Sequence, residues 1–386
     1  MLLALAALTM LLGACEYRPE RGKVHAEESP SHQASESPSI PGPNSTEGIT
    51  DPGLGPTNPP PKVTGGYRVR TLAGSGSHSF ADGKGAAAAF GNPFGIAAAP
   101  DGNVYVADAG SNRIRKIARD GTVTTFAGTG AEGYKDGPAA QAQFRFPRGV
   151  ALGPDGSVFV ADTFNHVIRV ISPTGVVSTL VGTPGRKGLK NAPGTKAMLY
   201  APVAIAVAAD GRTLYVTEFE NHIVRVLSRT GQVVKTLAGT GRKGFKDGDA
   251  LKTQFDSPVG IVVDAAGTVF VADAANHRVR SIAGGTVRTI AGSRAGFKDG
   301  TGAAALLNLP FGLTTDRQGL LFVTDFANNT VRTVTKAGVV RTIVSPPRGV
   351  SSGPNELNLP AGLSWLGGRL FLADSGSAKI RIIERG

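Results

Sequence analysis

The most constraining feature of this chain is a phrase that recurs six times between residues 103 and 381. Each copy is an apolar run that ends in an acidic residue, and a turn joins it to a second apolar run that contains an Arg. The copies start 49 to 56 residues apart, too close for each one to bury a core alone. A unit of this length with four β-rich runs is typical of a propeller blade rather than of a helical repeat. The copies begin at Val104, Val158, Leu214, Val269, Leu321 and Leu370.

The second complete unit shows how one blade is built. Residues 148–152 are expected to form an inner strand, and a Pro-Asp-Gly turn joins it to a strand over 158–161. Two further turns separate strands over 167–171 and 176–181. Strands of four to six residues bounded by Gly, Pro and Asp are what an antiparallel blade requires.

The number of strands predicts how the ring closes. Six inner strands are recognisable, but the sixth unit has only three strands before the last residue. Residues 67–74 resemble the outer strands of other units and can supply the missing one. We therefore predict an all-β, six-bladed β-propeller over residues 67–386, closed by an N-terminal outer strand that leaves only short edges exposed.

The clearest copy of the repeat begins at Pro258. It carries Pro-Val-Gly-Ile, then Val-Ala-Asp ending at Asp273, then Asn-His-Arg-Val ending at Val279. This order resembles the NHL-repeat family, and the resemblance extends over residues 67–386. It implies the propeller fold, but members of that family serve as scaffolds, sensors and a few enzymes. Function must therefore be argued from the side chains.

The N-terminus carries a second recognisable pattern. An apolar run over residues 1–12 leads into Leu-Gly-Ala-Cys ending at Cys15, which resembles the lipobox of bacterial lipoproteins. The resemblance implies a signal peptide over residues 1–14, lipid on Cys15 and a location at the bacterial cell envelope. Residues 15–66 then form a tether rich in Ser, Pro and Gly that is expected to be disordered. The alternative is a buried N-terminal helix with a free thiol.

The charge of the chain is unevenly distributed. Its net charge is +12, and residues 16–66 carry −3, so the rest carries +15. Such a body attracts anionic envelope polymers, anionic lipid surfaces or acidic proteins. We do not expect nucleic acid as a partner, because stacking aromatic residues are sparse. We expect a monomer.

An acid and an Arg recur at fixed positions in all six copies. The acid ends the second strand, and the Arg follows seven residues later. We interpret them as structural pairs or turn anchors rather than as substrate ligands. The pairs are Asp108 and Arg115, Asp162 and Arg169, Glu218 and Arg225, Asp273 and Arg280, Asp325 and Arg332, and Asp374 and Arg381.

Three His residues could suggest a metal site, but their position argues for a turn role. His166, His222 and His277 occupy one turn position, where other copies have Asn or Ala. The amidating lyases among six-bladed NHL proteins hold zinc through His residues just after the Pro of inner strands. Here those positions hold no His, so we predict no catalytic residues, no metal site and no cofactor, although a divalent metal in the channel stays open. The positions are Phe94, Arg148, Val203, Val259, Phe311 and Ala361.

The loops that lead from each outer strand to the next inner strand are long and similar. Most contain an aromatic residue, a Lys, an Asp and a Gly, and they should emerge on the face of the turns between second and third strands. We predict a basic recognition face there. The alternative is that the aromatic fills the gap between blades, Asp-Gly forms a turn and Lys is only solvated. The proposed face consists of Lys135, Arg148, Arg186, Lys187, Lys190, Arg242, Lys243, Lys246, Arg294 and Lys298.

Together these patterns favour a lipid-anchored binding or scaffold module at the bacterial envelope, without catalysis. The alternative is a metal-dependent enzyme of the lactonase or lyase-like propeller class, with its site in the central channel. A third possibility is an envelope sensor that signals through a partner. Two or more inward carboxylates or amides at the channel mouth would favour the enzyme, and an apolar channel would favour the binding module.

Overall fold

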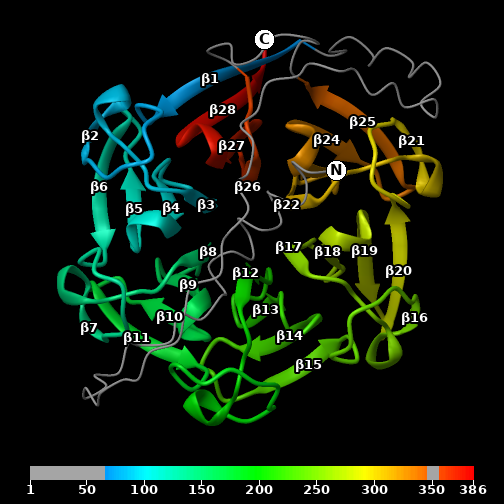
Figure 1. The fold of residues 1–386 in the computed structure, drawn as a ribbon, viewed down its shortest axis with the longest axis horizontal. Helices are drawn as coiled ribbons and strands as arrows, with labels where there is room; N and C mark the ends of the chain where they lie inside the picture. The colour runs from blue at the N-terminus through cyan, green and yellow to red at the C-terminus, as the bar shows by residue number, and fades with distance from the viewer. Residues whose placement is uncertain (1–65, 346–355) are drawn as a thin grey trace, which may run out of the picture. The chain divides into compact units, whose positions relative to one another are not determined.

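The computed structural model describes residues 66–345 and 356–386, all within one unit, Pro61–Gly386. These residues form six antiparallel sheets arranged as blades around a central axis (Figure 1). This confirms the all-β, six-bladed propeller expected from the sequence. The predicted signal peptide, Cys15 and the tether as far as residue 65 lie outside the described residues. Over the two described ranges, no helix has the length and apolar character needed to cross a bilayer.

Blades 1 to 3 follow one another along the chain. In each of them the four long strands run from the inner to the outer one, and the two-residue strand, where present, comes first in the chain and lies outermost. Blade 1 has β2 (Gly83–Lys84), η1 (Gly85–Ala87), β3 (Pro93–Ala98), β4 (Val104–Asp108), η2 (Ala109–Ser111), β5 (Arg113–Ile117) and β6 (Thr122–Ala127). Blade 2 has β7 (Gly137–Pro138), η3 (Ala139–Gln141), β8 (Pro147–Leu152), β9 (Val158–Asp162), η4 (Thr163–Asn165), β10 (Val167–Ile171) and β11 (Val176–Val181). Blade 3 has η5 (Gly194–Lys196), β12 (Pro202–Val207), β13 (Thr213–Glu218), β14 (Ile223–Ser228) and β15 (Val234–Ala238).

Blades 4 to 6 complete the ring. Blade 4 has β16 (Gly248–Asp249), η6 (Ala250–Lys252), β17 (Pro258–Val263), β18 (Val269–Asp273), η7 (Ala274–Asn276), β19 (Arg278–Ala283) and β20 (Thr286–Ala291). Blade 5 has β21 (Gly300–Thr301), η8 (Gly302–Ala304), β22 (Pro310–Thr315), β23 (Leu321–Asp325), η9 (Phe326–Asn328), β24 (Thr330–Val334) and β25 (Val339–Val344). Blade 6 has β26 (Pro360–Leu366), β27 (Arg369–Asp374), η10 (Ser375–Ser377), β28 (Lys379–Arg385) and β1 (Tyr67–Ala73).

The ring closes through the two ends of the described chain. Strand β1 pairs with β28 in an antiparallel register that joins Tyr67 to Arg385 and Ala73 to Ile380. The blue strand therefore completes the red sheet in Figure 1. This confirms that the N-terminal strand supplies the outer strand of the last blade.

Four of the sheets contain a fifth, two-residue strand that the sequence did not predict. Strands β2, β7, β16 and β21 come from the loops between blades and pair with the outer strands. Blade 3 lacks this strand. At the position of Gly137 and Gly248, which adopt φ of 123° and 114°, blade 3 has Ala192, and a Cβ would be strained in that conformation.

The hydrophobic core lies between blades rather than inside any one of them. Phe144, for example, enters from the loop before β8 and packs with Ala107 and Ile114 of blade 1 and with Val160 of blade 2. A comparable cluster fills each of the other junctions around the ring. Each blade therefore depends on its neighbours for burial, as expected for a repeat architecture.

The inner strands approach one another through a ring of glycines. A Cβ on Gly260 would collide with the carbonyl oxygen of Phe311 in the next inner strand, and a Cβ on Gly149 would collide with the Val203 carbonyl oxygen. Blade 3 has Ala204 at the equivalent position. The glycines allow the six inner strands to close to a narrow channel.

Candidate functional site

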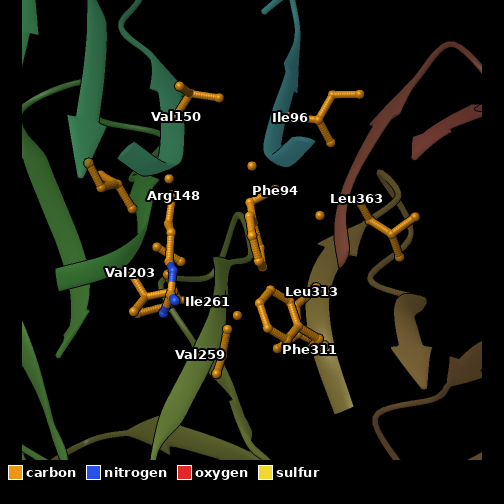
Figure 2. A pocket seen from close by; sticks show the side chains of 17 residues that line it. Phe94, Ile96, Arg148, Val150, Val203, Val259, Ile261, Phe311, Leu313 and Leu363 are labelled. Carbon is orange, nitrogen blue, oxygen red and sulfur yellow. The ribbon is translucent and has the colours of Figure 1, made fainter. Parts of the chain in front are cut away.

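The central channel is a small cavity lined mostly by apolar side chains. It has a volume of about 90 Å³ and is lined by the inner strands β3, β8, β12, β17, β22 and β26. Most of the side chains in Figure 2 are Val, Ile, Leu or Phe, and one is the charged Arg148. No carboxylate, amide or imidazole lines this cavity in the part of the chain that the structure describes. Nor do three or more His, Cys, Asp or Glu gather as possible metal ligands anywhere in the described ranges.

Arg148 lies inside the channel and not on an exposed face. Its side chain is 3% exposed and extends from β8 toward the axis (Figure 2). The guanidinium carbon lies 5.3 Å from the ring centre of Phe94, 5.0 Å from Phe146 and 5.7 Å from Phe164. The assignment of Arg148 to the basic recognition face is therefore wrong, because a residue just after the Pro of an inner strand points toward the axis.

The sequence analysis did not identify the aromatic cluster around this Arg. The rings of Phe94 and Phe311 lie 5.8 Å apart across the channel, and Phe311 stacks on Phe326 at 5.1 Å. Two of these rings follow the Pro that begins an inner strand, at Pro93 and Pro310. That Pro-Phe pair is the sequence signal that could have located the cluster.

The six repeated acids and Arg residues form six buried ion pairs. All twelve side chains are almost completely buried, and each acid accepts from the Arg of its own blade. The N···O distances run from 2.5 Å for Arg280 and Asp273 to 3.3 Å for Arg115 and Asp108. The strand acids also accept backbone N–H groups at the start of the adjacent inner strand, such as the N–H of Arg145 on Asp162 at 2.8 Å. Each pair therefore connects the third strand to the backbone just before the inner strand of the same blade.

Burial raises the pKa of three of these acids without neutralising them at pH 7. Loss of hydration raises the pKa of Asp162, Asp273 and Asp325 to about 6, and the neighbouring Arg in each blade opposes that rise. The pairs remain ionised at neutral pH, and the carboxylates accept further hydrogen bonds from Asn side chains.

The loop pattern that repeats between blades supports the buried Arg of the blade that follows. In blade 2 the Arg169 guanidinium lies between the ring of Tyr134, at 4.7 Å, and that of Phe144, at 5.1 Å. Asp136, two residues after Tyr134, accepts from Arg169 at 2.5 Å and from the Thr179 N–H at 3.1 Å. The aromatic and the Asp of the loop thus complete a sandwich around the Arg, and the Asp does more than form a turn.

Blade 3 departs from this arrangement in two compensating ways. Its loop has Leu189 and Asn191 where blade 2 has Tyr134 and Asp136. Arg225 therefore binds one carboxylate, from Glu218 at 2.5 Å, and the neutral Asn191 side chain. The longer Glu, in place of the usual Asp, reaches the same Arg.

The remaining predicted basic residues form an exposed arc on one face. The loops that carry them leave the outer strands beside the residues that follow η2, η4 and η7, since Gly128, Gly182 and Gly292 approach the carbonyls of those turn residues. Lys243 pairs with Asp256 at 3.4 Å, and Lys187 lies 4.9 Å from the ring of Tyr200. The arc is densest at the two junctions that flank blade 3. We define the basic arc as Lys135, Arg186, Lys187, Lys190, Arg242, Lys243, Lys246, Arg294 and Lys298, all exposed.

A family model for the NHL repeat matches three segments of the chain, residues 90–117, 144–171 and 255–280. These segments cover the inner, second and third strands of blades 1, 2 and 4. This chain is a six-bladed propeller that carries NHL repeats. The repeated acid and Arg fall inside each matched segment, so the buried ion pair is part of the repeat itself.

Two curated relatives of the NHL propeller are much longer than it is. The chloroplastic protein SUPPRESSOR OF QUENCHING 1 of Arabidopsis thaliana is 33% identical over 230 residues, which are 56% of this chain and 22% of that protein. NHL repeat-containing protein 2 of Bos taurus is 27% identical over 329 residues, 73% of this chain and 44% of that protein. The NHL propeller thus spans less than half the length of either relative.

Solved structures share the fold with the NHL propeller at low sequence identity. An auxiliary nutrient binding protein from Bacteroides thetaiotaomicron has a TM-score of 0.63 at 14% identity, covering 83% of this chain and 76% of that one. A gluconolactonase from Xanthomonas campestris has a TM-score of 0.55 at 17% identity, covering 83% and 90%. Propellers of this shape therefore include both binding proteins and enzymes, and the likeness shows the fold alone.

The three repeat His residues connect neighbouring blades of the NHL propeller. His166, His222 and His277 adopt φ of 52° to 58°, a left-handed conformation, at the end of the turn between the second and third strands of their blades. Their Nδ1 atoms accept the N–H groups of Ala201, Ser257 and Leu309 in the next blade, at 3.0 to 3.3 Å. Asn112 and Asn329 make the same contact through Oδ1, at 2.8 Å. These side chains therefore link neighbouring blades through a hydrogen bond. An imidazole must be neutral to accept that bond at Nδ1.

Replacing all three His residues with Asn is expected to remove a pH dependence of stability. Burial lowers the pKa of His166 to about 4 and that of His222 and His277 below the usual range, and Lys187 and Arg145 add to the effect at His166. Between pH 6.5 and 4 the unfolded chain binds protons that the folded chain does not, so stability falls as pH falls.

The expected loss is roughly 1–2 kcal/mol from pH 6.5 to 4.5 relative to the Asn variant, discounted because these rings are partly exposed. Urea unfolding of both proteins across this range measures it. The difference in unfolding free energy between the two proteins cancels the contribution of the buried Asp residues. Their raised pKa acts in the opposite direction, since it increases stability as the pH falls. If the free energies of unfolding of the two proteins changed with pH in parallel, this role of the His residues as hydrogen-bond acceptors would be contradicted.

Proposed function

We propose that the NHL propeller is a binding or scaffold module that recognises an anionic partner through the basic arc. The observation that carries this proposal is the gathering of nine exposed cationic side chains in loops of one face. Of the acids near them, Asp256 pairs with Lys243 and Glu220 interacts with Lys187, whereas Glu132 pairs with Arg145 outside the arc. Such an arrangement accelerates and orients the approach of an anionic surface.

The channel supports binding over catalysis. Lactonase-like or lyase-like chemistry on this fold needs convergent oxygen or nitrogen ligands, whereas the described lining is aliphatic and aromatic with one Arg. Arg148 cannot act as a general base, because a guanidinium stays protonated in proteins. No described side chain that lines the channel can therefore ligate a divalent metal or act as a general base.

A triple substitution in the arc tests the proposal. Changing Arg186, Lys187 and Lys190 to Gln should weaken binding of poly-L-glutamate about tenfold at low salt, with less difference at high salt. Fluorescence anisotropy of labelled polymer against the full chain measures the change. The matched control removes three exposed cations at the opposite end of the blades, Arg119, Arg212 and Arg317, and should leave binding within about twofold. Equal losses of affinity in the two triple variants would mean that the polymer responds to the net charge of the protein alone.

The proposal includes a lipid anchor at Cys15 that holds the module at the bacterial envelope. In a bacterial host fed labelled palmitate, the label should enter the wild-type protein and be absent from a Cys15→Ser variant. That variant should also leave the membrane fraction. Membrane retention of unlabelled Cys15→Ser protein would contradict the anchor.

A further inference from the structure

The rim of the propeller has a groove where blade 3 meets blade 4. It lies beside the outer strand β15 and has a volume of about 700 Å³. Residues from the loop before blade 3, from β15 and from the entrance to blade 4 form its walls. We define the rim groove as Leu189, Thr236, Gly239, Thr240, Arg242, Lys246, Leu251, Lys252 and Gln254.

In four other blades a loop Asp covers the free edge of the outer strand. The Thr179 N–H of β11 donates to the Asp136 carboxylate at 3.1 Å, and the Thr289 N–H of β20 donates to Asp247 at 2.9 Å. Asp82 and Asp299 make the same contact with blades 1 and 5. The outward N–H in the middle of these edge strands is thus satisfied within the chain.

Blade 3 lacks this cover. Asn191 occupies the position of the Asp, and its Oδ1 atom accepts from Arg225, so the side chain presents its amide donors rather than an acceptor. No side chain among the described residues accepts from the Thr236 N–H, the equivalent edge donor. The β15 edge is therefore open to an acceptor from outside, the requirement for strand addition.

Two exposed leucines flank the open edge. Leu251 is 61% exposed and stands where the other described junctions have Ala86, Ala140, Thr195 and Ala303. Leu189 is 48% exposed, and it replaces an aromatic ring that would stack on the buried Arg. The exposed part of each of these side chains offers apolar area to a ligand.

The charge of the rim groove is entirely positive. Arg242, Lys246 and Lys252 line it, and no acid does. Lys252 has a 3.5 Å contact with the exposed Asp249, whereas Asp247 is engaged with Arg280 at 2.5 Å. The rim groove therefore favours a ligand that is both acidic and apolar.

We propose that the rim groove binds an extended segment of a partner protein in which acidic and large apolar side chains alternate. An oxygen of that segment accepts the Thr236 N–H, its apolar side chains contact Leu251 and Leu189, and its acids face the three cations. The inference rests on the proposed function and names its partner class. An anionic polysaccharide would leave both leucines in water, and a flat lipid surface would not reach a concave strand edge.

An acetylated and amidated peptide of four Glu-Leu repeats, labelled with fluorescein, serves as the probe. Binding to the full chain is followed by anisotropy. Leu251→Ala, which restores the residue of three other blades, should weaken binding about fivefold. The control Val176→Ala removes a 47% exposed apolar side chain outside the groove and should change binding less than about twofold.

A second substitution tests the strand edge directly. Asn191→Asp supplies in blade 3 the carboxylate that covers the edge elsewhere, so the peptide should bind about fivefold more weakly while the protein stays folded. Thr195→Asp adds the same charge nearby, at the other end of the loop, and controls for electrostatics. Similar losses in the two Asp variants would overturn the role of the Thr236 N–H.

The outcomes separate this assignment from the proposed function. Equal binding of Glu-Leu and Glu-Ser peptides, or an equal effect of Leu251→Ala and Val176→Ala, overturns the rim groove while poly-L-glutamate binding to the basic arc stands. Conversely, Leu251-dependent peptide binding without arc-dependent poly-L-glutamate binding supports the groove and overturns the arc. Leu251-dependent binding to phosphatidylglycerol vesicles but not to the peptide would replace the partner protein with a lipid surface.

Discussion

Replacing Arg280 with Met is expected to lower the free energy of unfolding by about 3–5 kcal/mol. The guanidinium is fully buried and satisfies Asp273, which is itself buried, together with Asp247 at the surface of the blade. Removing the cation leaves the Asp273 carboxylate in a dry environment without a counter-charge. The two Phe rings that enclose the guanidinium, Phe245 and Phe255, also lose their partner.

Denaturant unfolding followed by circular dichroism measures this change. Arg288→Met provides the control, since Arg288 is an exposed residue of β20 in the same blade and should shift stability by less than about 0.5 kcal/mol. Asp247→Asn should cost less than Arg280→Met, because blade 3 folds with Asn191 at that position. If Arg280→Met matched Arg288→Met, the buried pair would contribute little to stability.

Gly260→Ala is expected to destabilise the propeller by about 1–3 kcal/mol. The added Cβ would collide with the carbonyl oxygen of Phe311, a backbone atom of the next inner strand that cannot rotate away. Relief requires the two strands to separate, which loosens the packing on both sides of the channel.

A reciprocal substitution in blade 3 controls for the effect of a methyl group. Ala204 already has a Cβ in the equivalent position, so Ala204→Gly should lower stability by about 0.5–1 kcal/mol, mainly through backbone entropy, with a small loss of packing. Thermal unfolding of both variants distinguishes the two causes. A Gly260→Ala protein as stable as wild type would mean that the inner strands tolerate a wider channel.

The repeat made the architecture predictable. An acid and an Arg recur seven residues apart in every copy, as Asp162 and Arg169 do in blade 2, so the period, the strand order and the candidate pair are all visible in one blade. Closure by residues 67–74 was predictable because their pattern matches an outer strand. Both features are local in sequence, and a repeat multiplies the local signal.

The features that were missed depend on distance in the folded ring. Asp136 contacts Arg169 from 33 residues away, along a path that first passes the rim and then returns to the axis. Sequence spacing gives no sign of that path, and a turn, part of the alternative interpretation of these loops, was the only role that the sequence offered for the Asp. Arg148 was misplaced for a different reason: its charge was given more weight than its position just after Pro147, which directs it to the axis as it does Phe94 and Phe311.

The closure of blade 6 sets the order in which the protein can complete folding. Tyr67 and Arg385 are 318 residues apart, so blades 1 to 5 are synthesised before the strand that completes the ring exists. Until then Phe90 of blade 1 lacks Phe371, and Ile343 of blade 5 lacks Leu370. Joining ends this distant, instead of the roughly 54 residues of one repeat, adds only about 1.6 kcal/mol of chain entropy. Ring closure is therefore late but costs little free energy, and the apolar faces of blades 1 and 5 stay uncovered until it happens.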